Sequence, residues 1–195
     1  MASDGGMMGH GYQRHPNAPK VRAPATAHWT TLFLVAVVTV AWWPALGGEF
    51  HYDDLANVVL DPATSDPAAL LDRLANGFRP LLRLSFVLDE RAWGLVPMGF
   101  IATNLLLHAL TVLAVAALAR RRLGNEVAAA LAATFFALQP AHAMAVAWTS
   151  GRSTVLSAAL MLAAMLAHER AVDSIRWRSL SLLLMVLAVL AKETA

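Results

Sequence analysis

The stretch WTTLFLVAVVTVAWWPAL, residues 29–46, decides the class of this protein because it contains no charged residue. At about 1.5 Å per residue, a helix of this length nearly matches a bilayer core of about 30 Å. Trp42 and Trp43 near its end suit the membrane interface, and the run is longer than the apolar part of a signal peptide. We therefore expect a retained transmembrane helix.

The composition extends this expectation to the whole chain. Of its 195 residues, 58% are hydrophobic and only 14% are charged, whereas soluble domains have about 45–50% apolar and about 25% charged residues. Residues 1–28 are polar and predict a disordered tail. We expect residues 29–195 to form an all-α, polytopic transmembrane helix bundle of about five spans. The four further apolar runs are residues 96–119, 127–150, 153–167 and 179–191.

Residues 47–95 form the longest polar segment between these runs, and we expect it to be an outer loop. Within it, a Ser65/Asp66 cap signal precedes apolar residues at helical spacing in residues 67–74. Residues 79–88 hold a second candidate, with Pro80 at its first turn. The pattern predicts one or two short amphipathic helices on the membrane surface.

The placement of Lys and Arg predicts the orientation. If the N-terminal tail is cytoplasmic, most of the 15 Lys and Arg residues lie in segments on the inner side. The loop 47–95 then faces outward. The chain has no cysteine, so disulfides and thiolate metal sites are excluded. Its basic residues are not interleaved with aromatic ones, which argues against a nucleic-acid partner.

Polar residues within the apolar runs mark candidate functional positions. Asn104, His108 and Thr111 share one helical face, which predicts either the lining of a cavity or an interhelical hydrogen-bond clasp. Gln139 and Pro140 interrupt the third run just before His142. A broken helix at membrane depth is tolerated only where it is buried or lines water.

Acidic and basic residues at the outer ends of these runs are candidates for a general base and for a phosphate-binding group. Asp53 and Asp54 follow the first run within the motif FHYDD, residues 50–54, and adjacent carboxylates can act as a general base. Arg152 opens a helix after a Ser-Gly turn, an arrangement that suits a phosphate. Taken alone, each feature is also common in ordinary loops.

The order of short motifs along the chain resembles a known family. They are FHYDD at 50–54 with Asn57, FRPL at 78–81, NLLLH at 104–108, ALQPAH at 137–142, AVAW at 145–148, SGR at 150–152 and AKE at 191–193. This series resembles the N-terminal membrane region of the TMTC proteins, the transmembrane and tetratricopeptide-repeat O-mannosyltransferases, and of their bacterial relatives. The resemblance covers residues 47 to 195.

The resemblance implies a partial GT-C fold and a glycosyltransferase that acts on the extracytoplasmic side. Its donor would be a polyprenyl-phosphate sugar and its acceptor a hydroxyl group, which a protein could carry. Asp53 or Asp54 would be the catalytic base. The carrier phosphate and substrate would be bound by Arg79 and Arg152 first, with His142, Lys192 and Glu193, while Asn104 and His108 would line the cavity. We expect no cofactor other than this donor, and no divalent metal.

The sequence also departs from the family pattern. Gln139 stands where members usually carry His, Met144 where they carry Glu, and Thr154 where they carry Asp. These differences favour an alternative, a non-catalytic membrane anchor or scaffold of a tetratricopeptide-repeat protein that keeps only the fold. A small transporter is a third hypothesis, and it would need a polar stripe through several spans.

The resemblance also bears on location and completeness. It predicts an integral protein of the bacterial inner membrane whose N-terminus is cytoplasmic. The chain stops on the charged pair Lys192 and Glu193 after an odd number of spans, which predicts that it is a fragment of a longer protein.

Overall fold

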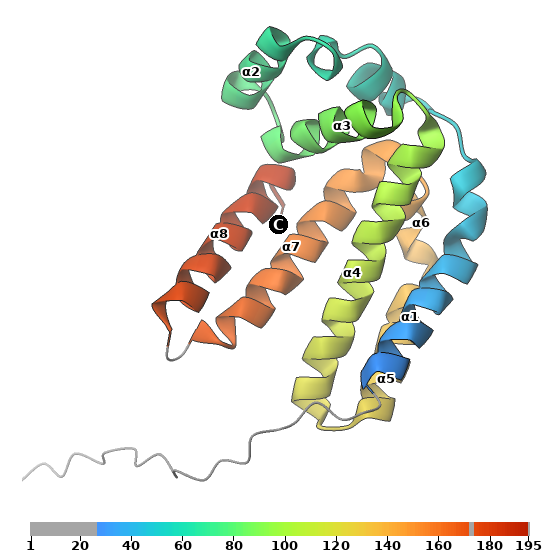
Figure 1. The fold of residues 1–195 in the computed structure, drawn as a ribbon, viewed down its shortest axis with the longest axis vertical. Helices are drawn as coiled ribbons and strands as arrows, with labels where there is room; N and C mark the ends of the chain where they lie inside the picture. Colours follow the sequence, from blue (N-terminus) through green and yellow to red (C-terminus); the bar gives the residue numbers. More distant parts are fainter. Residues whose placement is uncertain (1–26, 172–173, 195) are drawn as a thin grey trace, which may run out of the picture.

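The computed structural model describes residues 27–171 and 174–194, and all regular elements there are helical (Figure 1). Residues 1–26 of the predicted tail lie outside the described residues. The first described helix begins at Ala27. The membrane-type helices are α1 (Ala27–Trp42), α4 (Pro97–Leu123), α5 (Glu126–Ala137), α6 (Ala143–Val146), α7 (Arg152–His168) and α8 (Ile175–Ala191). The short η1 (Trp43–Gly47) continues the first span. The outer segment holds η2 (Leu55–Val59), η3 (Pro62–Thr64), α2 (Pro67–Asn76) and α3 (Pro80–Trp93).

The predicted fold class, a polytopic helical bundle, is confirmed. Within residues 27–171 and 174–194, three helices are long and apolar enough to cross a membrane, His28–Gly47, Pro97–Leu123 and Thr149–His168. A bent pair, Glu126–Ala137 with Pro140–Val146, raises the number to four. The fifth predicted span, residues 179–191, falls in α8, which has 17 residues, measures about 26 Å at 1.5 Å per residue and is not among these helices. The chain is an integral membrane protein, while its orientation stays a prediction.

Both amphipathic helices predicted in the outer segment are present, and their starts follow local rules. Asp66 caps α2 by accepting a hydrogen bond of 2.9 Å from the Ala68 amide, and Pro67 occupies the first turn. Pro80 occupies the first turn of α3. Figure 1 shows α2 and α3 lying across one end of the bundle, above the ends of α7 and α8.

Helix α4 is longer than the predicted span, which was placed at residues 96–119. It continues through Arg120, Arg121 and Arg122 and ends at Leu123. Gly124 then adopts a left-handed backbone with φ 62 and donates its amide to the Arg120 carbonyl. Basic residues in a last turn are favoured by the helix dipole, and glycine supplies the left-handed cap, so the helix has no reason to stop earlier.

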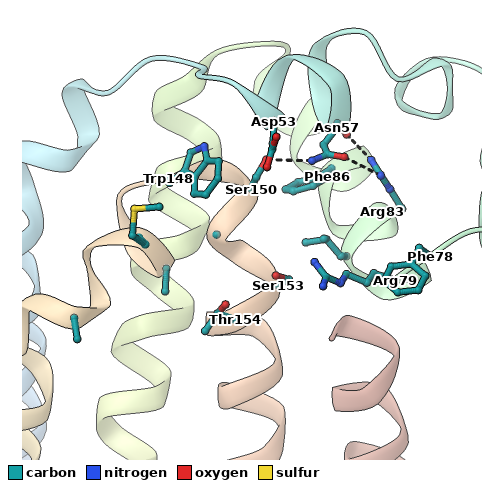
Figure 2. A pocket seen from close by; sticks show the side chains of 15 residues that line it. Asp53, Asn57, Phe78, Arg79, Arg83, Phe86, Trp148, Ser150, Ser153 and Thr154 are labelled. Atoms are coloured by element: carbon teal, nitrogen blue, oxygen red, sulfur yellow. Dashed lines mark hydrogen bonds between the residues drawn. The ribbon is translucent and has the colours of Figure 1, made fainter. Parts of the chain in front are cut away.

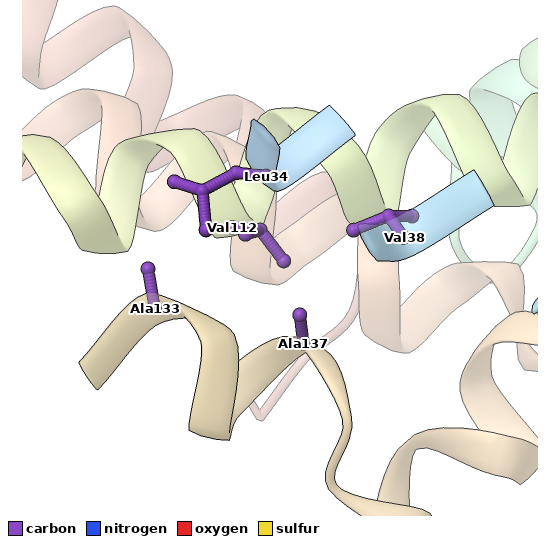
Figure 3. Packing of buried hydrophobic residues seen from close by; sticks show 5 residues of the cluster. All are labelled: Leu34, Val38, Val112, Ala133 and Ala137. Carbon is purple, nitrogen blue, oxygen red and sulfur yellow. The ribbon is translucent and has the colours of Figure 1, made fainter. Parts of the chain in front are cut away.

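A cluster of small and branched side chains holds α1, α4 and α5 together. Leu34 and Val38 of α1 meet Val112 of α4 and the alanines Ala133 and Ala137 of α5 (Figure 3). Alanine at such a contact lets helix backbones approach closely, which is how membrane helices gain packing energy.

The third span is broken where the sequence predicted. Backbone groups freed by such a break need hydrogen-bond partners, because lipid supplies none. After α5 the chain forms the short turn η4 (Pro140–His142) and then α6, and the segment Pro140–Val146 is bent by 51° from α5. The Ala137 carbonyl, freed by the break, accepts a hydrogen bond of 2.9 Å from Trp42 Nε1 of α1. Because neighbouring helices satisfy the freed groups, the break is tolerated at this depth.

Candidate functional site

An open pocket of about 450 Å³ lies between the outer segment and the bundle (Figure 2). Its walls come from η2, α3, α6, the turn η5 (Thr149–Gly151) and the start of α7. The lining residues are Asp53, Asn57, Phe78, Arg79, Leu82, Arg83, Phe86, Ala141, Met144, Ala145, Trp148, Ser150, Gly151, Ser153 and Thr154. Its volume is in the usual range of about 300–1,000 Å³ for ligand pockets.

The two adjacent carboxylates have different environments. Asp54 is fully buried and its Oδ1 accepts hydrogen bonds from the Ser150 amide at 2.7 Å and the Ser150 hydroxyl at 2.5 Å. Its Oδ2 accepts from the His51 amide at 3.1 Å. Asp53 is exposed and lines the pocket. Asp54 therefore fastens the outer segment to the turn before α7, while Asp53 is free to meet a ligand.

Two residues beside the pocket have a left-handed backbone that is uncommon for residues other than glycine. Tyr52 has φ 44 and Arg79 has φ 56. Such conformations cost about 1–3 kcal/mol each and persist where surrounding contacts enforce them. Tyr52 is 87% exposed, so its own packing does not offset this cost. The backbone turn instead directs the following residue, Asp53, to the pocket wall.

Arg79 holds the pocket wall to the segment after α8. Its Nε and Nη2 donate to the two carboxylate oxygens of Glu193 at 2.8 and 2.5 Å. The hydrogen bond to Glu193 raises the pKa of Arg79, and the same bond lowers the pKa of Glu193 to about 2. Beside this pair, Lys192 Nζ donates to the Thr154 hydroxyl at 2.9 Å. Three of the predicted phosphate-binding residues, Arg79, Lys192 and Glu193, thus meet at one side of the pocket.

Arg83 carries a second polar network along the pocket. It donates to the Asn57 carbonyl at 2.8 Å, to Asn57 Oδ1 at 2.9 Å and to Asp61 Oδ2 at 2.9 Å. Asn57 in turn lies 3.5 Å from the Ser150 hydroxyl (Figure 2). Burial lowers the pKa of Arg83, and the charge of Asp61 opposes this effect. An arginine remains protonated in either case, so the guanidinium keeps its charge.

Arg152 is placed inside the protein and does not line the pocket. Its side chain is completely buried and forms an ion pair of 2.5 Å with Asp89. It donates to Asn104 Oδ1 at 2.8 Å and to the Phe100 carbonyl at 2.7 Å, and its guanidinium lies 4.9 Å from the centre of the Phe86 ring. We call Arg152, Asp89 and Asn104 the buried clasp. It joins α3, α4 and α7 beneath the pocket.

Gly151 allows the turn before α7 to approach α6. A Cβ atom at this position would lie 1.9 Å from the Met144 carbonyl oxygen, so no other residue fits the backbone as it stands. This contact sets the positions of Ser150, which binds Asp54, and of Arg152, which forms the clasp.

The polar face of α4 supports the broken span. Asn104 Nδ2 donates to the Trp148 carbonyl at 2.9 Å. This bond is of the kind predicted for the polar face as the alternative to cavity lining. His108 Nε2 lies 3.3 Å from the Ala137 carbonyl. His108 and His142 meet edge to face, with ring centres 5.2 Å apart, and both line a separate cavity of about 230 Å³. His142 therefore does not reach the main pocket with Arg79.

Arg83 and Asn57 are pocket residues for which the sequence predicted no role. Each stands four positions after a residue that was singled out, Arg83 after Arg79 and Asn57 after Asp53. In a helix this spacing places both members on one face, which is the signal that could have found them. Asp89, the acid of the buried clasp, carries no such signal.

The predicted absence of a divalent metal stays a prediction. Among residues 27–171 and 174–194, no group of three or more His, Asp or Glu side chains is placed to hold a metal ion.

Comparison with known proteins identifies the relatives of this chain. It is 32% identical over 176 residues to protein O-mannosyl-transferase Tmtc1 of Drosophila melanogaster, which covers 82% of the chain and 20% of that protein. It is 31% identical over 200 residues to human TMTC1, covering 88% of the chain and 22% of that protein. Human TMTC3 is 29% identical over 180 residues, covering 82% and 20% respectively.

The chain therefore spans about a fifth of the length of the curated relatives it matches. No family model matches it, and no solved structure matches it. The similarity nevertheless extends over most of the chain, including the outer segment and the pocket, and it confirms the resemblance that the ordered motifs indicated. The chain belongs to the TMTC-like family.

Proposed function

We propose that this chain forms the pocket of a membrane glycosyltransferase that moves a sugar from a polyprenyl-phosphate carrier to an acceptor hydroxyl on the extracytoplasmic side. The observation that carries the proposal is that an exposed carboxylate, Asp53, and the guanidinium groups of Arg79 and Arg83 line one open pocket. Its curated relatives are named as protein O-mannosyl-transferases, which supports a protein as the acceptor and mannose as the sugar.

In the proposed reaction Asp53 is the general base. Its carboxylate takes the proton of the acceptor hydroxyl as that oxygen forms a bond to the anomeric carbon. The bond between this carbon and the phosphate oxygen breaks, and the phosphate leaves with the electron pair. Asp54 does not compete for this role, because its two oxygens already accept hydrogen bonds from Ser150 and His51.

Arg79 and Lys192 are the cations that we assign to the leaving phosphate. The Arg79 fork is held by Glu193, whose side chain is 46% exposed, so a phosphate can compete for it in water-accessible surroundings. Lys192 Nζ donates to the neutral Thr154 hydroxyl, and its charge adds to that of Arg79 beside the single carboxylate of Glu193. Arg83 contributes to the field of the pocket, with its donors directed to Asp61 and Asn57.

The test measures the rate of sugar transfer from a labelled polyprenyl-phosphate sugar, with the protein as its gene encodes it. Asp53→Asn should lower the rate by about 10²–10⁴-fold, the usual contribution of a general base, with an unchanged melting temperature. Glu49→Gln is the control, since Glu49 is an exposed acid of the same outer segment that does not line the pocket. Full activity of Asp53→Asn would refute the assignment.

The non-catalytic scaffold is the second candidate, and one observation favours it. Met144 and Thr154, which replace the Glu and Asp of the family pattern, both line the pocket, so this pocket is less acidic than the family pattern implies. Thermal stabilisation by a polyprenyl phosphate distinguishes the two. A scaffold should show none, whereas a pocket that binds the donor is stabilised by an amount that grows with the logarithm of ligand concentration once the site is mostly filled.

A further inference from the structure

Helix α7 ends and α8 begins at the end of the bundle that lies away from α2 and α3 (Figure 1). A cavity of about 370 Å³ opens there between α7, α8 and the end of α4. Its apolar lining includes Met161, Met165, Leu182 and Met185, and its polar lining includes Arg122 and Glu169. We call it the α7–α8 groove.

The apolar lining of the groove is exposed on the surface of the chain. Leu182 is 60% exposed, Met185 50% and Met165 47%, although all belong to helices with a membrane-type composition. Methionine side chains are flexible and fill irregular shapes, so such a lining adapts to an acyl chain. One end of the groove lies near His168 and Glu169, where α7 ends, and we place a lipid headgroup there.

The charges at this end favour an anion. Arg121 Nη1 and Arg122 Nη2 both donate to Glu169, at 2.6 and 2.9 Å, so two positive charges share one negative charge. Arg122 keeps 72% of its side chain exposed despite this bond. In the part of the chain that the structure describes, basic residues outnumber acidic ones at this end. The basic residues are Arg120, Arg121, Arg122, Arg170, Arg176 and Arg178, and the acidic ones are Glu126 and Glu169.

We propose that the α7–α8 groove binds an anionic glycerophospholipid. One acyl chain lies along the methionine lining, and the phosphodiester lies against Arg122 and Arg121, where its single negative charge neutralises the excess positive charge. Basic sites between membrane helices are suited to anionic headgroups. A zwitterionic lipid would offer the same acyl chain with a compensating positive charge, so it should bind more weakly. The proposal is independent of the proposed sugar transfer at the pocket.

Binding to the 195-residue chain in detergent tests the proposal, by native mass spectrometry and by the shift in melting temperature. The probes are phosphatidylglycerol, phosphatidylcholine, a dihexanoyl phosphatidylglycerol and inorganic phosphate. We expect long-chain phosphatidylglycerol to bind and stabilise most strongly, because only it offers both the acyl chain and the net negative charge. Arg122→Gln should weaken this binding about five-fold, the usual effect of one basic residue near an anionic surface.

Arg91→Gln is the matched control, since it removes one exposed arginine from α3 at the other end of the bundle and should leave binding unchanged. Equal binding of phosphatidylglycerol and phosphatidylcholine would overturn the proposal, as would equal loss in the two variants. If inorganic phosphate or the dihexanoyl lipid stabilised the chain as well as the long-chain lipid, the site would be a simple anion site and the groove would have no part in it.

Discussion

Arg152 and Arg79 each stand at the start of a helix near the same pocket, yet the protein uses them in opposite ways. Arg152 is wholly buried in the clasp with Asp89 and Asn104, and its partners lie on two other helices. Arg79 keeps 29% of its side chain exposed and holds an acid that is itself exposed. One arginine fixes the position of the pocket floor, and the other remains available at its wall.

The difference shows that the type of residue predicts a charge but not its use. A buried ion pair is costly to form and far more costly to break, because the remaining partner is left charged without solvent. A surface pair costs little either way. Consequently the two arginines should respond very differently to the same substitution.

The largest effect is expected from removal of the buried guanidinium. Arg152→Met should destabilise the protein by about 3–5 kcal/mol, because Asp89 would stay buried without its partner. Arg79→Met should change stability by no more than about 1 kcal/mol. Denaturant unfolding in detergent measures both. The double variant with Asp89→Asn should recover part of the loss, and equal effects of the two arginine substitutions would contradict the contrast.

The contact between Gly151 and α6 should be the next most sensitive. Gly151→Ala is expected to cost about 1–3 kcal/mol, since its methyl group would overlap a backbone oxygen that cannot move alone. Gly47→Ala is the control, because a Cβ there meets nothing within 4 Å. Thermal unfolding of the two variants compares them, and a Gly151→Ala protein as stable as the control would show that the turn can shift freely.

The adjacent carboxylates offer a smaller version of the same comparison. Asp54→Ala should lower stability by about 1–3 kcal/mol, because the Ser150 and His51 groups would lose their buried acceptor. Asp53→Ala, at an exposed position, should change stability by less than about 0.5 kcal/mol. If unfolding measurements gave the reverse order, the division between a structural and a free acid would be wrong.

The smallest effect should come from Glu193 and should depend on pH. Its pKa is lowered from the ordinary value of 4.5 to about 2 by the bond from Arg79, so its contribution is present above 4.5 and disappears as the pH falls toward 2. Glu193→Gln removes this contribution. The difference in melting temperature between the wild type and Glu193→Gln should therefore shrink over this range and with added salt. A difference that is constant with pH would contradict the ion pair.

The membrane fold and the broken span were predictable because their causes are local. Uncharged runs indicate spans, Pro140 indicates the break, and Asp66 and Pro80 indicate the starts of α2 and α3. The extension of α4 through Arg120 to Arg122 does not follow from the apolar pattern, because that pattern ends at the first charged residue. The cap at Gly124 shows that the helix and the apolar run end at different places.

The site was predicted in part, for a physical reason. Asp53 and Arg79 lie on the pocket wall because chain turns at the helix ends place them there. The clasp depends on contacts between helices that are distant in sequence, such as Arg152 with Asp89, and no local pattern reveals which charge will be buried. His142 likewise turns toward His108 only because the break directs α6 against α4.

The carbonyl of Ala137 also bears on how the protein is inserted into the bilayer. Helix α5 has 12 residues, about 18 Å at 1.5 Å per residue, which is too short to cross the hydrocarbon unaided. The groups that contact the Ala137 carbonyl belong to Trp42 of α1 and His108 of α4, and both helices are synthesised before α5. The broken segment can thus leave the translocon directly against helices that have already arrived. A circular permutant that delivered it first would strand it at the headgroups.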